Sequence, residues 1–198
     1  MTAYKQSYLN SCGAVALLCG AFELGIRTIP QNDDYSFTSL GPMPLKMDIA
    51  CEIAVYQIIS NNPLSTNPRL WGFGMPSQII KCSKMLGLNG FAISRNSLTT
   101  FGLKAMFREE LAKLRCLHAL VEQSKKTLPK GISNTALAMH QRKLKLLIKY
   151  RNGDLHYVMV RPDGTVMDPS CGQNFPSEIN FKRTMNMHGT GLSLIIQS

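Results

Sequence analysis

The chain has 198 residues, of which 44% are hydrophobic and 17% are charged. This length and composition exclude both a disulfide-stapled mini-protein and an intrinsically disordered chain. The formal net charge of +10 indicates an acidic partner, such as nucleic acid, a membrane surface or an anionic polymer.

The first half of the chain is predicted to be helical. Helices are expected over residues 11–24, 46–60, 77–86 and 99–114. Asn10 or Ser11 can cap the first helix and Gly25 can end it. This helix is apolar nearly all round, which predicts a central and buried position. The segments 30–44 and 61–75 contain turn-forming residues such as Pro and Gly and are expected to be loops.

The second half of the chain changes to a strand pattern. Short strands are expected at 117–122, 144–150, 156–161 and 165–167, and residues 191–196 would close the sheet. Asn152-Gly153 is the dipeptide favoured in two-residue hairpins, and residues 162–164 form a second tight turn. Helices followed by an antiparallel sheet make an α+β fold. With no repeat and no domain boundary, we expect a single domain, residues 1–198.

The sequence offers neither a membrane span nor a secretory leader. The apolar run from Ala14 to Phe22 is far shorter than the roughly 20 residues that a span requires. Lys5 and Gln6 are followed by polar residues instead of the apolar core of a signal peptide. We therefore expect that the chain has no signal peptide and is located in the cytoplasm.

Most of the excess positive charge lies in one segment. Residues 1–98 carry a net charge of +2, whereas residues 104–151 carry +9. The basic segment lacks the interleaved aromatic residues, the glycine-rich loops and the motifs of nucleic-acid readers, which disfavours nucleic acid as the partner. The segment predicts an electropositive side that suits an acidic substrate surface.

The cysteines and histidines do not form a metal-binding pattern. The six cysteines have no C-x-x-C pair among them and are expected to be free thiols in a reducing compartment: Cys12, Cys19, Cys51, Cys82, Cys116 and Cys171. His118, His140 and His188 have no cysteine or carboxylate at ligand spacing. We expect neither a metal nor another cofactor.

Cys12 stands at the start of the first predicted helix. There the free N–H groups and the helix dipole stabilise a thiolate, which makes Cys12 a candidate nucleophile. Gly13 would leave room for a substrate, and the amide of Gln6 is a candidate donor to an oxyanion. Cys19 lies two turns further along the helix and is expected to be a buried packing residue.

His156 and Asp168 belong to the same predicted hairpin. Because the hairpin turns at residues 162–164, Asp168 would lie near the His156 end of the neighbouring strand and could orient its imidazole. The alternative is an ordinary strand histidine and an Asp-Pro turn. Trp71 could form one wall of a substrate groove or could pack under a long loop. Cys171 could line the active-site cleft or could be an unreactive loop residue.

These residues together resemble the papain-like cysteine peptidases of clan CA, especially the C39-like branch. Three elements carry the resemblance. The first is Gln6, which is separated from Cys12 by five residues, and the second is the run that opens the helix, Asn10-Ser-Cys-Gly-Ala-Val-Ala-Leu-Leu18. The third is Leu155-His-Tyr-Val-Met-Val160 followed by Asp163-Gly-Thr-Val-Met-Asp-Pro169. The resemblance implies a papain-like fold, with Cys12 at the start of a central helix packed on a C-terminal antiparallel sheet. It implies that Cys12 is the nucleophile, His156 the base and acid, Asp168 its orienter and Gln6 an oxyanion donor.

The resemblance predicts hydrolysis of an amide bond in a specific protein substrate. Compact enzymes of this kind resemble papain-like effectors that bacteria deliver into a host or target cell, so delivery by a specialised secretion system is an expectation beside the cytoplasm. A protein-glutamine deamidase or transglutaminase-like acyl transferase with the same triad is the main alternative. A peptidoglycan amidase and a basic nucleic-acid binding protein are lesser ones.

Overall fold

The computed structural model describes residues 1–30, 42–60, 65–95, 107–123, 137–149 and 151–198. The helices are α1 (Cys12–Glu23), α2 (Ile49–Ser60), the short 3-10 helix η1 (Pro68–Leu70), α3 (Pro76–Met85), α5 (Arg108–Cys116) and α6 (Glu178–Met185). The strands are β1 (Thr28–Ile29), β2 (Met43–Pro44), β3 (Asn89–Arg95), β4 (Leu120–Gln123), β5 (Gln141–Lys149), β6 (Leu155–Val160), β7 (Val166–Asp168), β8 (Gln173–Phe175) and β9 (Met187–Gln197).

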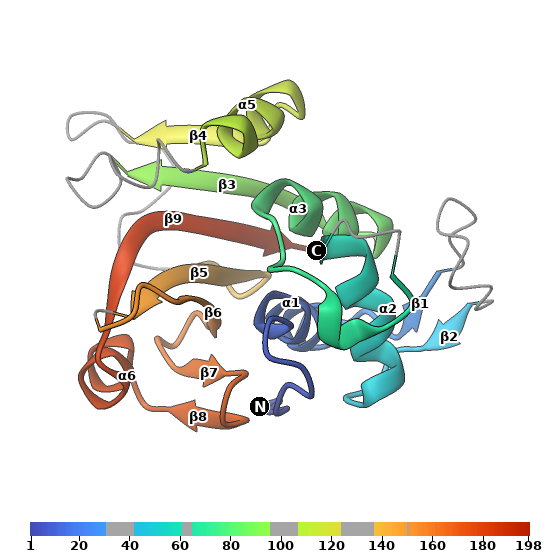
Figure 1. The fold of residues 1–198 in the computed structure, drawn as a ribbon, viewed down its shortest axis with the longest axis horizontal. Helices are drawn as coiled ribbons and strands as arrows, with labels where there is room; N and C mark the ends of the chain where they lie inside the picture. Colours follow the sequence, from blue (N-terminus) through green and yellow to red (C-terminus); the bar gives the residue numbers. More distant parts are fainter. Residues whose placement is uncertain (31–41, 61–64, 96–106, 124–136, 150) are drawn as a thin grey trace.

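A seven-stranded sheet in the order β4-β3-β9-β5-β6-β7-β8 forms the centre of the protein. All neighbours are antiparallel except β3 and β4, which run parallel. Helices α1 and α3 contact the sheet on one side, α2 packs against both of them, and α6 lies at the other side (Figure 1). The mixed architecture agrees with the α+β class expected from the sequence.

Helix α1 lies in the middle of the main core. Ten of its residues, Cys12 to Ala21, are buried, because small residues let the helix approach the sheet closely. A Cβ atom on Gly20 would lie 2.8 Å from the side chain of Ile196 in β9. The helix ends at Glu23, and Gly25, directly after the C-cap residue Leu24, has a φ of +94° that suits glycine. The prediction of a buried central helix at residues 11–24 is confirmed.

Helices α2 and α3 also agree with the predicted segments 46–60 and 77–86. Of the predicted helix 99–114, the part before residue 107 lies outside the described residues, and the observed helix is α5. None of the helices within the described ranges is long and apolar enough to cross a bilayer.

The sheet is larger than the sequence pattern indicated. Strand β9 was expected to close the sheet at residues 191–196, but it lies between β3 and β5. Strands β3 and β8 and helix α6 were not anticipated, and the β3/β4 pair is parallel. The hairpin after β5 closes by a hydrogen bond from Lys149 N to Asp154 O, so its loop is longer than the two-residue turn expected from Asn152-Gly153. Period-two patterns identify strands but not their neighbours.

Candidate active site

Cys12 is the first residue of α1 and its side chain is nearly buried, with 2% of the residue exposed. The backbone N–H of Tyr157 in β6 donates to its Sγ at 3.5 Å. Ser11 occupies the N-cap position but makes no capping bond, because its hydroxyl donates to Glu52 at 2.6 Å. The N–H groups of the first turn therefore have no side-chain cap and are directed at the space around Cys12.

His156 lies on β6 close to both Cys12 and Asp168. Its Nε2 is 2.6 Å from Oδ1 of Asp168, which leaves Nδ1 as the ring nitrogen for the thiol. Burial disfavours the charged ring, but hydrogen bonds with Asp168 and Cys12 and their negative charges outweigh it and raise the pKa of His156 to about 9. The site therefore favours the charged, imidazolium form of His156.

The pairing of β6 with β7 explains why His156 and Asp168 meet. Met159 pairs with Met167. If this register is continued by one residue, Asp168 lies opposite Val158, which is two positions from His156 in β6. Residues two apart on a strand share a face, and such diagonal neighbours are within reach of each other. The hairpin predicted from the sequence thus brings the two side chains together.

Asp168 is fully buried and is held by the loop that follows it. Its carboxylate accepts hydrogen bonds from the Ser170 N–H at 2.9 Å, the Ser170 hydroxyl at 2.7 Å and the Cys171 thiol at 3.3 Å. Burial opposes ionisation, but the bonds from His156 and Ser170 outweigh it and lower the pKa of Asp168. The sequence analysis did not identify Ser170. A signal was available, because an aspartate side chain often accepts a hydrogen bond from the backbone N–H two residues later in a turn.

Gln6 lies on the segment that leads to Cys12. Its backbone N–H donates to Pro169 O at 2.8 Å, which ties this segment to the loop after Asp168. The side-chain amide nitrogen donates to the carbonyls of Tyr8 at 2.7 Å and Leu9 at 2.9 Å. Both amide hydrogens are therefore engaged, and the role of Gln6 as an oxyanion donor stays a prediction that requires the amide to turn.

Two neighbours of the site are packing residues. A Cβ atom on Gly13 would lie 3.1 Å from Tyr157 and 3.2 Å from Ile79, so glycine here serves close helix packing and does not leave room for a substrate. Trp71 is 3% exposed, packs edge-on against Tyr56 and donates from its indole to Ser65 O. Of the two interpretations of Trp71, the structure supports packing under a loop.

Glu52 was not anticipated from the sequence, yet it holds the segment that precedes Cys12. This fully buried carboxylate on α2 accepts from the Ser7 N–H at 2.8 Å, the Ser11 hydroxyl at 2.6 Å and the Tyr4 hydroxyl at 3.0 Å. The sequence alone does not distinguish a single buried glutamate in a helix from an exposed one. The position of Cys12 therefore depends on a residue 40 positions away in the chain.

We expect Glu52→Gln to destabilise the protein by about 1–3 kcal/mol. The glutamine amide has an NH₂ group in place of one carboxylate oxygen, so a donor would face the buried donors that this oxygen now accepts from. Chemical denaturation measures the free energy of unfolding. Glu109→Gln is the matched control, because Glu109 is exposed on α5. Equal stability of the two variants would contradict the role of Glu52.

Gly172 fixes the contact between the loop after Asp168 and the N-terminal segment. Its φ is +67°, and a Cβ atom would lie 2.8 Å from the backbone nitrogen of Lys5. We expect Gly172→Ala to cost about 2 kcal/mol or more in the free energy of unfolding, since backbone strain and a clash add together. Gly164→Ala, at φ +83° with nothing within 4 Å, isolates the backbone strain and should cost about 1 kcal/mol. Equal losses would show that the Lys5 contact does not matter.

The basic segment 104–151 is partly neutralised. Within the described residues, four of its side chains form ion pairs: Lys113 with Glu110, Arg115 with Glu122, Arg142 with Glu23, and Lys145 with Glu178. Residues 104–106 and 124–136 lie outside the described part. An electropositive side that suits an acidic substrate stays a prediction.

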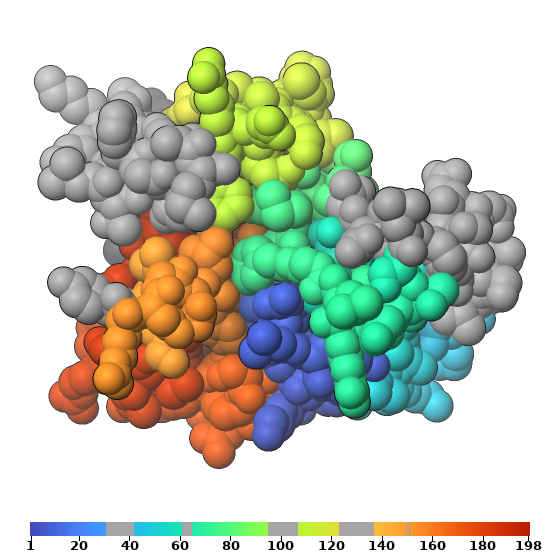
Figure 2. All heavy atoms as spheres, viewed as in Figure 1, coloured from blue at the N-terminus to red at the C-terminus, as the bar shows by residue number. Residues whose placement is uncertain are grey.

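Figure 2 shows part of the N-terminal region, in blue, at the surface between orange residues of the C-terminal half and the green residues that follow α2. The six cysteines are free; Cys12, Cys19, Cys51 and Cys82 are buried, Cys171 is partly exposed and Cys116 is exposed. The described residues contain no group of three or more His, Cys, Asp or Glu placed to hold a metal ion.

Comparison with known proteins gives one family. Residues 4–198 match the model of the family described as invasion plasmid antigen J, cysteine protease. The chain is 32% identical over 186 residues to the cysteine protease IpaJ of Shigella flexneri, in an alignment that covers 87% of this chain and 66% of the relative. The chain thus spans just under two thirds of that relative's length. No solved structure matches.

Proposed function

Because the chain belongs to the invasion plasmid antigen J family of cysteine proteases, we propose that it hydrolyses an amide bond in a specific protein substrate by means of Cys12, His156 and Asp168. The observation that carries the proposal is the arrangement of the three side chains. The Nε2 atom of His156 is bonded to a buried carboxylate, and its ring contacts a thiol at a helix N-terminus. This arrangement has the parts of a nucleophile, a base and an orienting group.

The reaction begins with an ion pair. The thiol proton passes from Sγ of Cys12 to Nδ1 of His156, and Asp168 stabilises the imidazolium through Nε2–H. The backbone N–H of Tyr157 remains directed at the sulfur. The thiolate then attacks the carbonyl carbon of the scissile amide, and the carbonyl π electrons move to oxygen.

The tetrahedral oxyanion needs donors, and the N-terminus of α1 supplies the first. The backbone N–H of Cys12 donates to it, and Gln6 provides a second donor once its amide turns from Tyr8 and Leu9. His156 gives its proton to the departing amine, which leaves a thioester on Cys12. A water molecule that His156 deprotonates then releases the acid and restores the thiol.

The same residues serve related acyl transfers. Deamidation of a substrate glutamine by water, and transfer of its acyl group to an amine, require the same thioester. Peptide hydrolysis is the first choice because the family is described as a cysteine protease. We also propose delivery into a host cell as an effector, which the family's designation as an invasion plasmid antigen supports.

Mass spectrometry separates these reactions. Candidate host proteins are incubated with the wild type and with Cys12→Ala, and the peptides are compared. Proteolysis predicts new termini that appear only with the wild type. A mass increase of about one dalton at glutamine, without new termini, would instead assign deamidation.

A further inference from the structure

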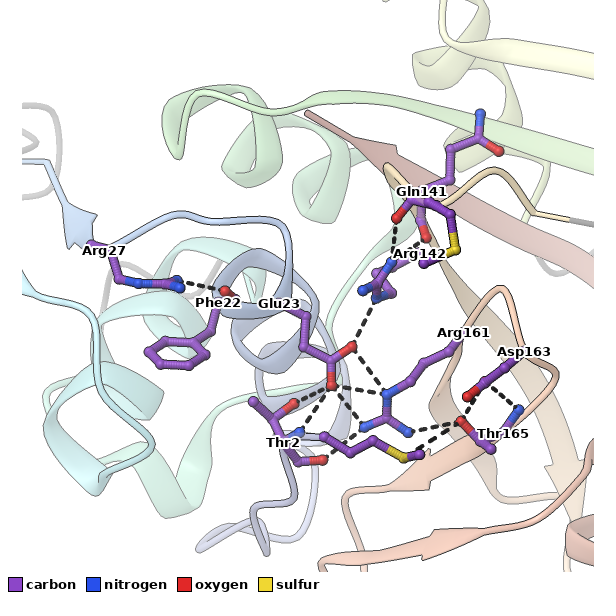
Figure 3. Close-up of polar contacts among 11 residues, drawn as sticks. Thr2, Phe22, Glu23, Arg27, Gln141, Arg142, Arg161, Asp163 and Thr165 are labelled. Atoms are coloured by element: carbon purple, nitrogen blue, oxygen red, sulfur yellow. Dashed lines mark hydrogen bonds and ion pairs between the residues drawn. The ribbon is translucent and has the colours of Figure 1, made fainter.

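The two elements that bring Cys12 and His156 together also meet at their far ends. Helix α1 begins at Cys12 and ends at Glu23. Strand β6 starts one residue before His156 and leads into Arg161. At the near end the backbone N–H of Tyr157 donates to Sγ of Cys12 at 3.5 Å. At the far end Nε of Arg161 donates to both carboxylate oxygens of Glu23, at 2.8 and 3.0 Å (Figure 3).

The spans of α1 and β6 between these two contacts match. The helix covers about 16 Å from Cys12 to Glu23. The extended chain from His156 to Arg161 also covers about 16 Å. The helix and the strand therefore run side by side in the same direction. A shift of α1 along β6 by one strand residue, about 3.3 Å, would break the contacts at both ends.

Between the two ends the contact surface is apolar. A Cβ atom on Gly13 would lie 3.1 Å from the ring of Tyr157, and one on Gly20 would lie 3.5 Å from the sulfur of Met159. Apolar contacts are non-directional, whereas a guanidinium bonded to a carboxylate has a defined geometry. The ion pair of Glu23 and Arg161 is thus the directional contact at the far end.

The position of Glu23 is unfavourable for a carboxylate. It is the last residue of α1, where the helix dipole disfavours negative charge, and its side chain is only 9% exposed. Burial opposes ionisation, but the bonds from Thr2 and Arg142 and the charge of Arg161 outweigh it and lower the pKa of Glu23. Buried ion pairs often contribute little net stability, and their best-attested use is to fix the register of packed elements.

The guanidinium of Arg161 is held by further acceptors, and its side chain is 4% exposed. Its Nη2 donates to Thr2 O at 2.7 Å and its Nη1 donates to the Thr165 hydroxyl at 3.3 Å. Thr2 in turn donates to Glu23 from its N–H at 3.0 Å and from its hydroxyl at 2.6 Å. Arg161 is thus fixed relative to both the end of α1 and the turn after β6.

We propose that Glu23 and Arg161 are positioning residues, which set the register of α1 on β6 and so hold Cys12 in contact with His156. The inference rests on the proposed function, because it concerns the nucleophile and the base assigned there. Both residues lie about 16 Å along their elements from the reacting groups and act through these elements. Loss of the pair should loosen the contact between the thiol and the imidazole without removing either group.

The pKa of His156 tests the proposal, because it depends on the contact with Cys12 and needs no substrate. Against the effect of burial, hydrogen bonds with Asp168 and Cys12 raise this pKa to about 9 in the wild type. NMR titration of the full chain measures it from the imidazole signals that are absent in His156→Ala. We expect Arg161→Met to lower it by at least about half a unit, because the contribution of Cys12 weakens. Arg161→Lys keeps the charge but not the planar fork, and it should give a smaller decrease.

Arg142→Met is the matched control. Arg142 donates from Nε to the same carboxylate at 2.8 Å, and its side chain is 11% exposed, but it belongs to β5. Its loss removes one positive charge and one bond from Glu23 and leaves the contact between α1 and β6. The pKa of His156 should therefore equal that of the wild type. Chemical denaturation of the three variants records their loss of stability separately.

Two results would overturn the proposal. An unchanged pKa of His156 in Arg161→Met, or in Arg161→Lys if the methionine variant does not fold, would show that the pair has no influence on the site. Equal decreases in Arg161→Met and Arg142→Met would assign the effect to the charge around Glu23 and not to register. Failure of the proposed function is a separate result, because it would appear as unchanged amide hydrolysis in Cys12→Ala.

Discussion

Replacing Cys12 by alanine is expected to lower kcat/KM for amide hydrolysis by about 10⁵-fold or more, because no other group can form the thioester. Cys12 is the thiol that contacts His156 and accepts from the Tyr157 N–H. The measurement is the rate of product formation from a cleaved substrate identified by mass spectrometry. Unchanged circular dichroism and unfolding temperature must accompany the loss.

Cys19→Ala is the matched control for this variant. Cys19 is buried on the same helix, and burial raises the pKa of its thiol to about 12, so it remains protonated. It should retain wild-type kcat/KM, with at most a loss of stability. Activity that survives Cys12→Ala, or that disappears in a folded Cys19→Ala, would contradict the assignment.

Replacing Asp168 by asparagine is expected to lower kcat/KM by about 10²–10⁴-fold and to change its pH dependence. In the wild type, activity should fall as the pH rises through about 9, where His156 loses its proton. The negative charge of Asp168 favours the imidazolium, so removing it lowers the pKa of His156. The alkaline limb of the kcat/KM profile should then move to lower pH by at least about one unit.

Asp163→Asn is the matched control, because Asp163 belongs to the turn after β6 and bonds only to Thr165 among the described residues. Its pH profile should coincide with that of the wild type. If Asp168→Asn lowered activity but left the alkaline limb in place, the carboxylate would be a structural support and not the group that holds the imidazolium.

Local patterns in the sequence predicted the elements that carry the site. The small apolar residues from Cys12 to Ala21 specify a buried helix, and the tight turn at 162–164 brings Asp168 back toward His156. Both inferences rest on contacts between residues close in the chain. They required no knowledge of distant pairing.

The rest of the fold depends on contacts that the sequence does not encode locally. Strand β9 pairs with β3 about 100 residues earlier, and no periodic pattern identifies that neighbour. Likewise, the engagement of Gln6 by the carbonyls of Tyr8 and Leu9 depends on the path of its own loop. Glu52 acts through three donors from the N-terminal segment, so its importance became visible only in three dimensions.

The central claim is that Cys12 is the nucleophile and that His156 activates it, and alkylation tests this claim without any substrate. Iodoacetamide is reacted with the wild type and with His156→Ala at about pH 5.5, where ordinary thiols are protonated, and each cysteine is quantified by peptide mass spectrometry. We predict that Cys12 is alkylated well before the other five cysteines in the wild type, including the exposed Cys116, and that His156→Ala abolishes this preference. Equal alkylation of all six cysteines, or a Cys12 rate that is unchanged in His156→Ala, would contradict the claim.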